Sequence, residues 1–484
     1  MALGQEDYGI YGLIGGLTII ISFMNVLLSV SISRYYAYSI GEANRLRAIG
    51  QGDRGLEECQ RWFNAALSIH TVVPVLLVLA GYPLGVYLIR HFLEIPLGKV
   101  DACVLVWNYT CISCFASMVN VPFNSMYVAK QYIAELTIYS FAQTLANVIF
   151  FYYMASHPGD WLLKYAAWMC MVAVIPQVII CVRALQVLPE CKINFRFLFD
   201  VSRFKQLGSF AFWQMFGGLG AIIRNQGIAV LINKYFGARL NASFSIANQV
   251  SAHTQTLAGA MQGAFQPAIV TAFGAGDIEK ARSLAVKATK FALILTLIFC
   301  LPLSIEINQV IRLWLKTPPP HSAGLCLCMI MLLLVDKASA GECLACNATG
   351  RVAAYQSIGG GLLILCLPMA WIMIVHGCGI YSVGVAIVVT ALANTFNRVW
   401  FARRLLGLSI RRWFMGTIMP IGVASLCGMT SGIVAKLTLR PSFSRIIVTS
   451  FLVEIVFLPV VWICVFNSDE RKYVVDTLRK LRGC

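Results

Sequence analysis

The sequence predicts an all-α polytopic membrane protein, and three observations lead to that class. The 484-residue chain is 59% hydrophobic and only 12% charged, about half the charged fraction that is usual in a soluble protein. Apolar stretches of roughly 20 to 30 residues recur along it, and a membrane-spanning helix needs about 20. The connections between these stretches are short and hold turn-forming residues, so none is long enough for a separate soluble domain.

Hydropathy and helix-breaking residues divide the chain into about thirteen predicted spans. These spans run approximately over 8–38, 62–90, 102–125, 132–155, 161–186, 207–236, 241–273, 285–315, 322–346, 354–376, 380–406, 412–436 and 443–467. The longest connections are the polar stretch near Gly41–Arg61 and the segment Pro189–Gln206.

The placement of the basic residues explains the net charge of +17. Lys and Arg gather in the short connections, where they orient helices and contact anionic membrane lipids, and no run of like charges resembles a nucleic-acid-binding arm. With the Gly41–Arg61 connection in the cytoplasm, about 26 basic residues lie inside, about 10 outside and about two within spans. The first residues are then outside and the basic C-terminal tail inside.

An internal repeat accounts for the odd number of spans. Tyr38–Arg47 (YSIGEANRLR) aligns with Phe273–Arg282 (FGAGDIEKAR) at an offset of 235 residues. Span 8–38 then corresponds to span 241–273, and the span that precedes the second copy has no counterpart in the first. The repeat predicts a 14-helix plan whose first helix is missing. It has two pseudo-symmetric six-helix lobes and an additional helix pair, a plan typical of secondary carriers. The predicted parts are an N-terminal lobe at 1–190, a C-terminal lobe at 191–406, the helix pair at 407–467 and a basic cytoplasmic tail at 468–484.

Motifs for catalysis and for cofactor binding are missing from the sequence. It contains no Gly-rich phosphate loop, no HExxH and no nucleophile elbow. The 17 cysteines lie mostly in apolar stretches, and the CxxC pairs at Cys111 and Cys343 lack a second ligand pair, so we expect small hydrophobic side chains rather than metal ligands. We therefore expect no enzyme, no metal and no cofactor, and a transport step driven by an ion gradient, the membrane potential or the substrate gradient.

Arg224 is the deepest predicted charge, near the centre of span 207–236 and followed by Asn225 and Gln226. It shares one helix face with Gly217, Gly220 and Gly227. One interpretation is a close helix contact through the small residues, with Arg224 ion-paired to a neighbour. The other is a cation that faces an aqueous cavity, and we favour it because a charge inside the membrane is costly and usually functional.

A polar stripe runs along span 241–273. It consists of Asn248, Gln255, Gln262 and Gln266 at helical spacing, with small residues between them. Span 8–38 carries a thinner stripe that includes Asn25. Amides provide both donors and acceptors, which suits sugars or phosphates. A polar seam between packed helices is the alternative, and in both cases the stripe faces away from lipid.

Ionisable residues inside other spans are candidates for the same cavity or for ion coupling. We expect Lys337 to join Arg224 in a cationic cavity, with Asp336 or Glu342 neutralising it or carrying a proton. Asp336 and Lys337 are adjacent in sequence, so we expect their side chains to point in different directions. Glu135, near a helix end, is a further candidate for coupling, and a structural ion pair is the alternative for all of these residues.

Two segments resemble a known family. Leu3-Gly4-Gln5-Glu6-Asp7-Tyr8-Gly9-Ile10-Tyr11, and Asn120-Val121-Pro122-Phe123-Asn124 followed by Gln131, are similar to the helix junctions of polysaccharide flippases. These flippases belong to the multidrug/oligosaccharidyl-lipid/polysaccharide exporter (MOP) superfamily. The likeness extends over essentially the whole chain, apart from the absent first helix.

The resemblance implies a V-shaped carrier of two lobes that works by alternating access. It implies export of an undecaprenyl-pyrophosphate-linked oligosaccharide across a bacterial inner membrane, beside a glycan polymerase or glycosyltransferases. Arg224, and then Lys337, would hold the pyrophosphate, and the amide stripe the sugars. The runner-up is a multidrug or organic-cation exporter of the same superfamily, which would need carboxylates in the cavity. A glycan-processing membrane enzyme would need a sizeable outer loop with paired acidic residues or histidines, and the sequence has none.

Overall fold

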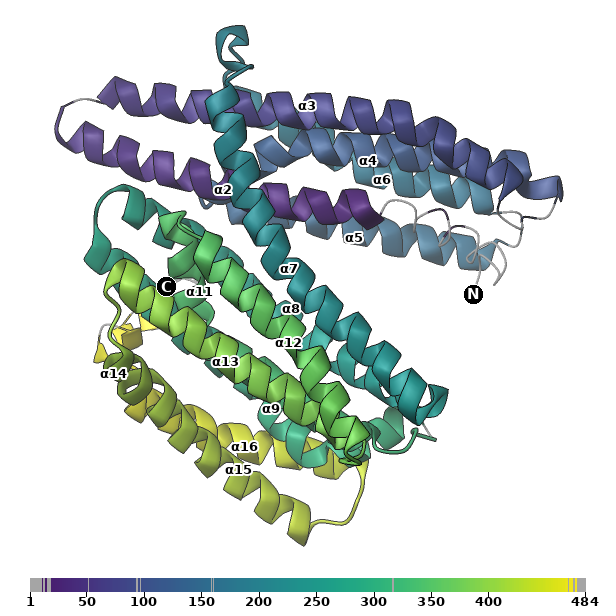
Figure 1. The fold of residues 1–484 in the computed structure, drawn as a ribbon, viewed down its shortest axis with the longest axis vertical. Coiled ribbons are helices and arrows are strands. Elements are labelled where there is room, and N and C mark those ends of the chain that lie inside the picture. Colours follow the sequence, from purple (N-terminus) through teal and green to yellow (C-terminus); the bar gives the residue numbers. More distant parts are fainter. Residues whose placement is uncertain are drawn as a thin grey trace. The chain divides into compact units, whose positions relative to one another are not determined.

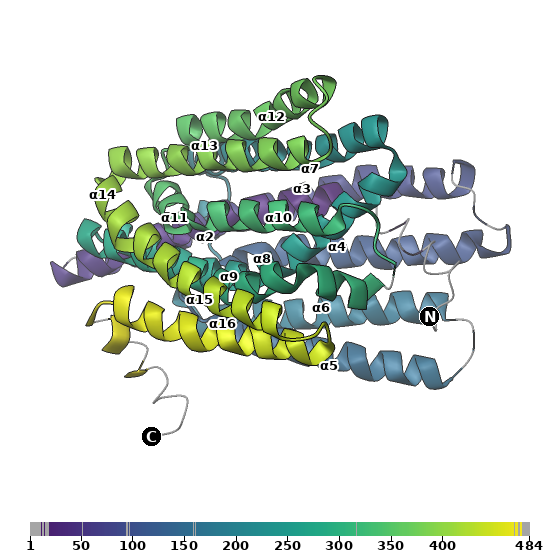
Figure 2. The ribbon, with the colours of Figure 1, turned by 90° about the horizontal axis from the view of Figure 1, so that it is seen from below.

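The computed structural model describes residues 11, 14, 19–50, 52–92, 95, 97–157, 159, 161–315, 317–468, 470–472 and 475–476. Helices make up nearly all of this part of the chain, and no β-strand occurs in it. Figures 1 and 2 show long helices joined by short connections. The all-α polytopic fold class predicted from composition and hydropathy is confirmed. The segment Leu3–Ile10 and most of the basic tail lie outside the described residues.

The helices follow the predicted spans in order along the chain. The first six are α2 (Ile19–Ala48), α3 (Gly52–His91), α4 (Val100–Ala129), α5 (Ile133–Ser156), α6 (Leu162–Val187) and α7 (Val201–Phe236). The next four are α8 (Ala238–Gly274), α9 (Ile278–Leu315), α10 (Ser322–Lys337) and α11 (Ala340–Thr349). The last five are α12 (Ala353–Val375), α13 (Tyr381–Leu406), α14 (Ile410–Trp413), α15 (Met419–Thr438) and α16 (Phe443–Cys464), with the π-helical turn η4 (Phe414–Ile418) joining α14 to α15.

Among the described residues, ten helices are long and apolar enough to cross a membrane, or eleven if the bent pair α10 and α11 counts as one span. The two long helices outside this set are α2 and α8. They match predicted spans 8–38 and 241–273, which carry the two polar stripes.

The predicted span 322–346 is interrupted. α10 ends at Lys337, α11 begins at Ala340, and the two axes differ by 46°. Helical backbone stops at this break, so the groups around Lys337 and Ser339 need partners other than the next turn of the helix. The candidate site described below is built around this point.

The chain separates into two compact units. Unit 1 contains residues 1–212 and 270–277, and unit 2 contains 213–269 and 278–484. In unit 1, α4 packs against α2, α3 and α6, and α2 also packs against α3. In unit 2, α9 is the most enclosed helix: 61% of the residues in its most apolar 18-residue segment are buried. In the corresponding segment of α5, in unit 1, no residue is buried. α10, α11, α15 and α16 all pack on α9.

The register of the internal repeat differs from the predicted one. At the predicted offset Gly41 lies inside α2, whereas Gly276 lies in a turn with a φ of +79°. The helix ends correspond instead at an offset of 226 residues, from 48 to 274, from 50 to 276 and from 52 to 278. Gly50 and Gly276 then coincide, both with a φ of +79°, a conformation that favours glycine. The sequence carries a signal close to this register, AIGQGD at 48–53 against AFGAGD at 272–277.

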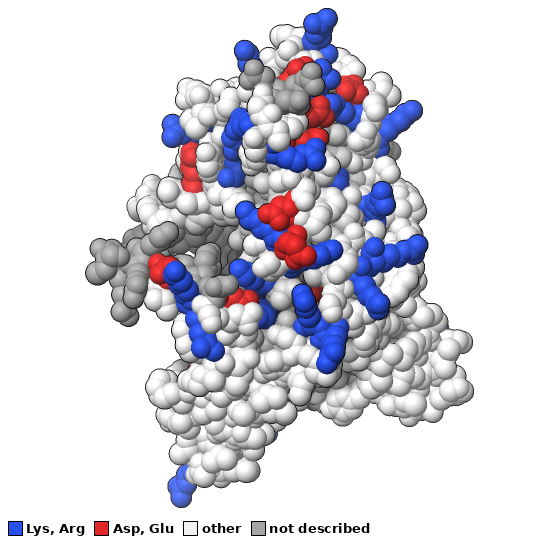
Figure 3. All heavy atoms as spheres, turned by 90° about the vertical axis from the view of Figure 1, so that its left-hand side faces the viewer, with Lys and Arg blue, Asp and Glu red and all other residues white. Residues whose placement is uncertain are grey.

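Charged side chains gather at helix ends. Figure 3 shows Lys and Arg on the face at the left of Figure 1, where α13 ends and α14 begins. Arg403 and Arg404 lie in the last turn of α13, and Arg411 and Arg412 in α14. By the rule that basic connections stay inside, this end of unit 2 is the predicted cytoplasmic end.

Candidate functional site

The glycines of α7 form a close contact with α12 in unit 2. A Cβ atom at position 220 would lie 2.7 Å from the carbonyl oxygen of Gly360, and one at position 227 would lie 2.6 Å from the side chain of Leu367. Only glycine permits this approach of the two backbones. The glycine face of α7 is therefore a packing face, in agreement with the expected close helix contact through small residues. Arg224, which shares this face, lies beside the contact.

Arg224 faces two adjoining cavities of unit 2. One, of about 430 Å³, lies against α8 and α10, and the other, of about 290 Å³, lies against α10, α12 and α13. Arg224 is 8% exposed, and its Nε donates to the side-chain oxygen of Asn225 at 3.2 Å. Among the described residues, no carboxylate forms an ion pair with it. The structure thus places this cation at a cavity, as the second interpretation expected.

Four of the expected polar residues line the same cavities. They are Asn225, Gln226, Asn248 and Gln255. Gln262 and Gln266 lie further along α8, outside both cavities, so the stripe contributes only its first part. Asn25 lies in unit 1, where it lines a different cavity. The residues expected to form one site are therefore divided between the two units.

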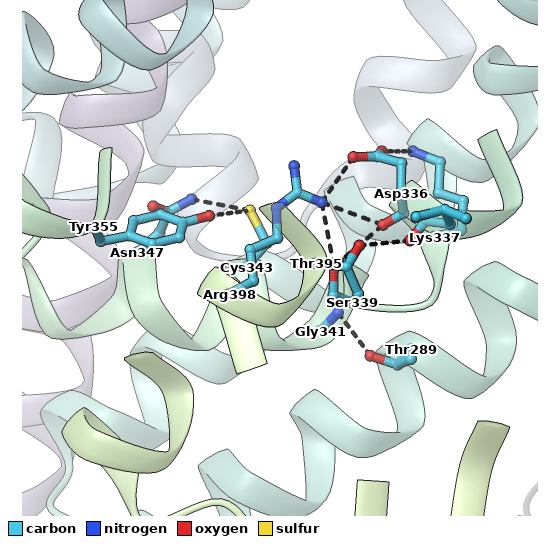
Figure 4. Close-up of polar contacts among 11 residues, drawn as sticks. Thr289, Asp336, Lys337, Ser339, Gly341, Cys343, Asn347, Tyr355, Thr395 and Arg398 are labelled. Atoms are coloured by element: carbon cyan, nitrogen blue, oxygen red, sulfur yellow. Dashed lines mark hydrogen bonds and ion pairs between the residues drawn. The ribbon is translucent and has the colours of Figure 1, made fainter. Parts of the chain in front are cut away.

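An ion network at the break between α10 and α11 forms the wall of the smaller cavity (Figure 4). The Nη1 atom of Arg398 lies 2.7 Å from Oδ1 of Asp336 and donates to the backbone oxygen of Asp336 at 3.2 Å. It also lies 3.4 Å from the Ser339 hydroxyl. The backbone groups freed by the break thus find partners, and Asp336 orients Arg398.

Two expectations for Lys337 are wrong. Its Nζ lies 3.5 Å from Oδ2 of Asp336, although adjacent helical residues normally point apart. Because α10 ends at Lys337, its long side chain can fold back onto the preceding carboxylate. Lys337 is 1% exposed and lines neither cavity, so it reaches the Arg224 region only through the carboxylate that it shares with Arg398.

The other two carboxylates lie away from the Arg224 cavities. Glu342 accepts a hydrogen bond from the Thr289 hydroxyl at 2.7 Å and lines a separate cavity at the predicted cytoplasmic end of unit 2. Glu135 is in unit 1, 3.2 Å from Nε of Arg183, and accepts a hydrogen bond from the Tyr139 hydroxyl at 2.9 Å. Only Asp336 of the three candidates for ion coupling lies at the cavities.

Sequence analysis missed Arg398, which lies four residues after Asn394 on α13. Both residues line the smaller cavity. The signal was present, because span 380–406 carries Asn394, Asn397 and Arg398 at helical spacing. The cysteines of the second CxxC pair lie next to this network. Tyr355 donates its hydroxyl hydrogen to the sulfur of Cys343 at 3.2 Å, so this sulfur acts as a weak acceptor in the packed wall.

Comparisons with known proteins agree with this fold. The model of a family described as polysaccharide biosynthesis proteins matches residues 162–310. No curated protein matches the sequence of this chain. The crystal structure of a MATE mutant has a TM-score of 0.70 at 16% identity, over 84% of this chain and 89% of that one.

Two further structures share the fold. An outward-facing multidrug resistance MATE family transporter of the MOP superfamily has a TM-score of 0.67 at 16% identity, over 84% of this chain and 89% of that one. A MOP superfamily transporter from Pyrococcus furiosus has a TM-score of 0.57 at 15% identity, over 84% of this chain and 94% of that one. The chain therefore has the fold of the MOP-superfamily membrane transporters.

Proposed function

We propose that this protein is a flippase that moves a lipid-linked oligosaccharide from the cytoplasmic to the outer leaflet of a bacterial inner membrane, by alternating access. The observation that carries the proposal is the Arg224 side chain at a cavity inside the membrane-spanning part of unit 2, with no ion pair to a described carboxylate. The family model supports the same choice, because its description names polysaccharide biosynthesis.

The charges around the cavities suit an anionic headgroup. Arg224 and Arg398 contribute two guanidinium groups and Asp336 one carboxylate, which Arg398 and Lys337 already contact. A guanidinium group binds phosphate oxygens through parallel hydrogen bonds, and a low-dielectric cavity strengthens them. A pyrophosphate at Arg224 would supply the negative charge that the protein does not. Asn225, Gln226, Asn248 and Gln255 would then contact the first sugars.

Export of an organic cation is the second candidate, because one structure of the same fold is described as a multidrug resistance transporter. A cationic substrate needs a carboxylate that is free to face it. In the cavities of unit 2 that contain Arg224, the one described carboxylate is Asp336, which is held by Arg398. Another structure of this fold is described as having a binding pocket of reverse polarity and a different function, so the fold accommodates cavities of different charge.

The proposed binding of pyrophosphate also suggests how transport is coupled to protons and which enzymes act beside the protein. Asp336 would change its partner when the pyrophosphate takes over Arg398, and it would be the residue that takes up a proton. Glycan polymerase or glycosyltransferases would supply and consume the lipid-linked glycan.

The test is reconstitution of the full chain into proteoliposomes that contain an undecaprenyl-pyrophosphate-linked oligosaccharide. We expect Arg224→Ala to abolish flipping and Arg224→Lys to retain part of it, because lysine keeps the charge but not the paired hydrogen bonds. Lys234→Ala removes an exposed cation from the same helix and should flip normally. Normal flipping by Arg224→Ala, or ethidium export that depends on Asp336, would overturn the proposal.

A further inference from the structure

A second cavity, inside unit 1, has a lining that is polar but uncharged. It has a volume of about 480 Å³ and lies between α2, α4, α5 and α6. None of the described residues that line it is Asp, Glu, Lys or Arg. Besides three serines, its polar lining consists of Asn25, Asn120, Asn124, Tyr139, Gln143 and Gln177. A cavity of amides and hydroxyls has no charge for an ion, but it presents many donors and acceptors to a neutral polar ligand.

Two acceptors in this lining are left without a partner. The side-chain oxygens of Asn25 and Gln177 are buried and accept no hydrogen bond from any described residue. The amide nitrogen of Asn25 donates to the Ser117 hydroxyl at 3.4 Å, which holds the side chain in place. Buried polar groups are nearly always hydrogen-bonded in folded proteins. A ligand that reorients these two amides on entering the cavity would supply the donors that the protein leaves out.

An aromatic ring completes the lining. Tyr139 lines the cavity, and its hydroxyl donates to Glu135, which is paired with Arg183. These contacts hold the ring in place beside the amides. A sugar ring has C–H faces that pack on an aromatic side chain and hydroxyls that bond to amides, so it matches both parts of this surface. Glu135, expected from the sequence as a coupling residue, acts here as a positioning residue for Tyr139.

The cavity lies nearer one end of its helices. Its lining comes from 136–143 of α5, 173–180 of α6 and 117–124 of α4, which are the halves closest to the connections 130–132 and 188–200. The positive-inside rule assigns these connections to the cytoplasm. The lining that α4, α5 and α6 contribute therefore lies toward the side on which the glycan is made.

We propose that the unit 1 cavity is a binding site for a neutral sugar. That this sugar belongs to a transported glycan rests on the function proposed above, but the site itself rests only on the lining of unit 1. Unit 1 then binds uncharged sugar groups only, whereas unit 2 binds the phosphate and the sugars next to it.

The experiment measures saturation-transfer NMR from the detergent-solubilised full chain to the methyl glycosides of glucose, galactose and N-acetylglucosamine. We expect at least one of them to bind. Gln177→Met and Asn25→Leu each remove one acceptor and should weaken binding about fivefold, the ratio that one neutral hydrogen bond gives. Gln206→Leu changes an exposed amide of the same unit, outside the cavity, and should leave binding unchanged.

Thermal unfolding of the same variants separates a ligand site from a structural one. Gln177→Met removes an acceptor that has no partner, so its unfolding temperature should match or exceed that of the parent protein. No saturation transfer to any of the three glycosides, or equal binding by the parent protein and both variants, would overturn the site. A clear loss of stability in Gln177→Met would also overturn the site, because it would show that the Gln177 amide stabilises the fold rather than binding a ligand.

Flipping assays distinguish failure of this site from failure of the proposed function. Arg224→Ala should keep its binding of neutral glycosides, since that residue belongs to unit 2. If Arg224→Ala flips normally but Gln177→Met loses glycoside binding, the function fails and the sugar site stands. If Arg224→Ala does not flip and Gln177→Met binds as the parent protein does, the sugar site alone is wrong.

Discussion

The cavities of the two units show two ways to keep polar groups inside a membrane protein. The unit 1 cavity is lined by amides and hydroxyls, and two of its acceptors have no partner among the described residues. In the unit 2 cavities, Asp336 and Arg398 form an ion pair that extends to Lys337. An unpaired neutral amide is much less costly to bury than an unpaired charge. Neutral cavities can therefore keep free acceptors for a ligand, whereas charged cavities need an internal network.

Arg224 is the exception in unit 2, and its surroundings explain why it is tolerated. It bonds to Asn225 and faces open cavity space rather than packed apolar side chains. An arginine next to an aqueous cavity keeps part of its hydration, so the cost of burying it falls. Unit 2 therefore contains two kinds of charge: Asp336, Arg398 and Lys337 are paired with one another, whereas Arg224 is available to a substrate.

The largest effect is expected from breaking the network of unit 2. Asp336→Ala leaves Lys337, which is 1% exposed, and Arg398 without their carboxylate. Removal of one partner from a buried ion pair costs about 3–5 kcal/mol, and the 31% exposure of the Asp336 side chain places this variant at the lower end. We expect a loss of about that size in denaturant unfolding of the purified protein.

The double variant Asp336→Ala with Lys337→Met serves as the control for this result. It removes the orphaned lysine along with the carboxylate and should recover part of the loss. Unchanged stability of the single variant would show that the ion network is not what holds the break between α10 and α11.

A matched pair of glycines on α7 compares its two ends. Gly220→Ala places a methyl group 2.7 Å from the Gly360 oxygen in unit 2, and overpacking of this kind costs about 1–3 kcal/mol. Gly208, in unit 1, has no atom within 4 Å of its hypothetical Cβ. Gly208→Ala should therefore stabilise the helix by about 0.5–1 kcal/mol. Opposite signs in unfolding experiments are expected, and equal signs would contradict the close contact of α7 with α12.

Anion binding should distinguish the two cavities directly. Inorganic pyrophosphate is expected to bind to the purified protein, and Arg224→Ala should weaken that binding about tenfold or more, because a charge-assisted hydrogen bond contributes about 1.5–3 kcal/mol. Gln177→Met in unit 1 should bind pyrophosphate as the parent protein does. Isothermal titration at two salt concentrations measures this. An equal loss of pyrophosphate affinity in Arg224→Ala and Gln177→Met would show that anion binding is not specific to the cavities of unit 2.

The smallest effect is expected at the helix-end ion pairs of unit 1. Burial alone would raise the pKa of Asp200, but hydrogen bonds from the backbone and side chain of Arg203 outweigh it, and the pKa lies below its usual value. Asp200 therefore adds stability above its ordinary pKa and loses it as the pH falls through the lowered value. Asp200→Asn should cost at most about 1 kcal/mol at neutral pH. Denaturant unfolding at pH 7 and pH 3 should show that most of this difference disappears in acid, and a difference that grows in acid would contradict the sign.

The sequence predicted those site residues whose signal lies within one helix, and it did not predict those whose role depends on a contact between distant helices. Arg224, Asn248 and Gln255 were predicted because charges and amides at helical spacing stand out within one apolar stretch. Arg398 lies on the same kind of stretch but near its end, and only its contact with Asp336 across two helices gives it a role. Gln262 and Gln266 continue the stripe of α8 without reaching the cavity, because periodicity specifies a face but not where along the helix a cavity ends.

The sequence by itself determined where the long helices lie along the chain, and it predicts their orientation, since bilayer thickness and loop charge act on each segment separately. Only the tertiary structure decided which helix faces meet. It broke span 322–346 at Lys337, moved the repeat to its structural register, and placed Asn25 and Arg224 in different units. Helix contacts in a membrane depend on side-chain packing and on pairing between distant residues rather than on hydropathy, and a single sequence does not show those pairs.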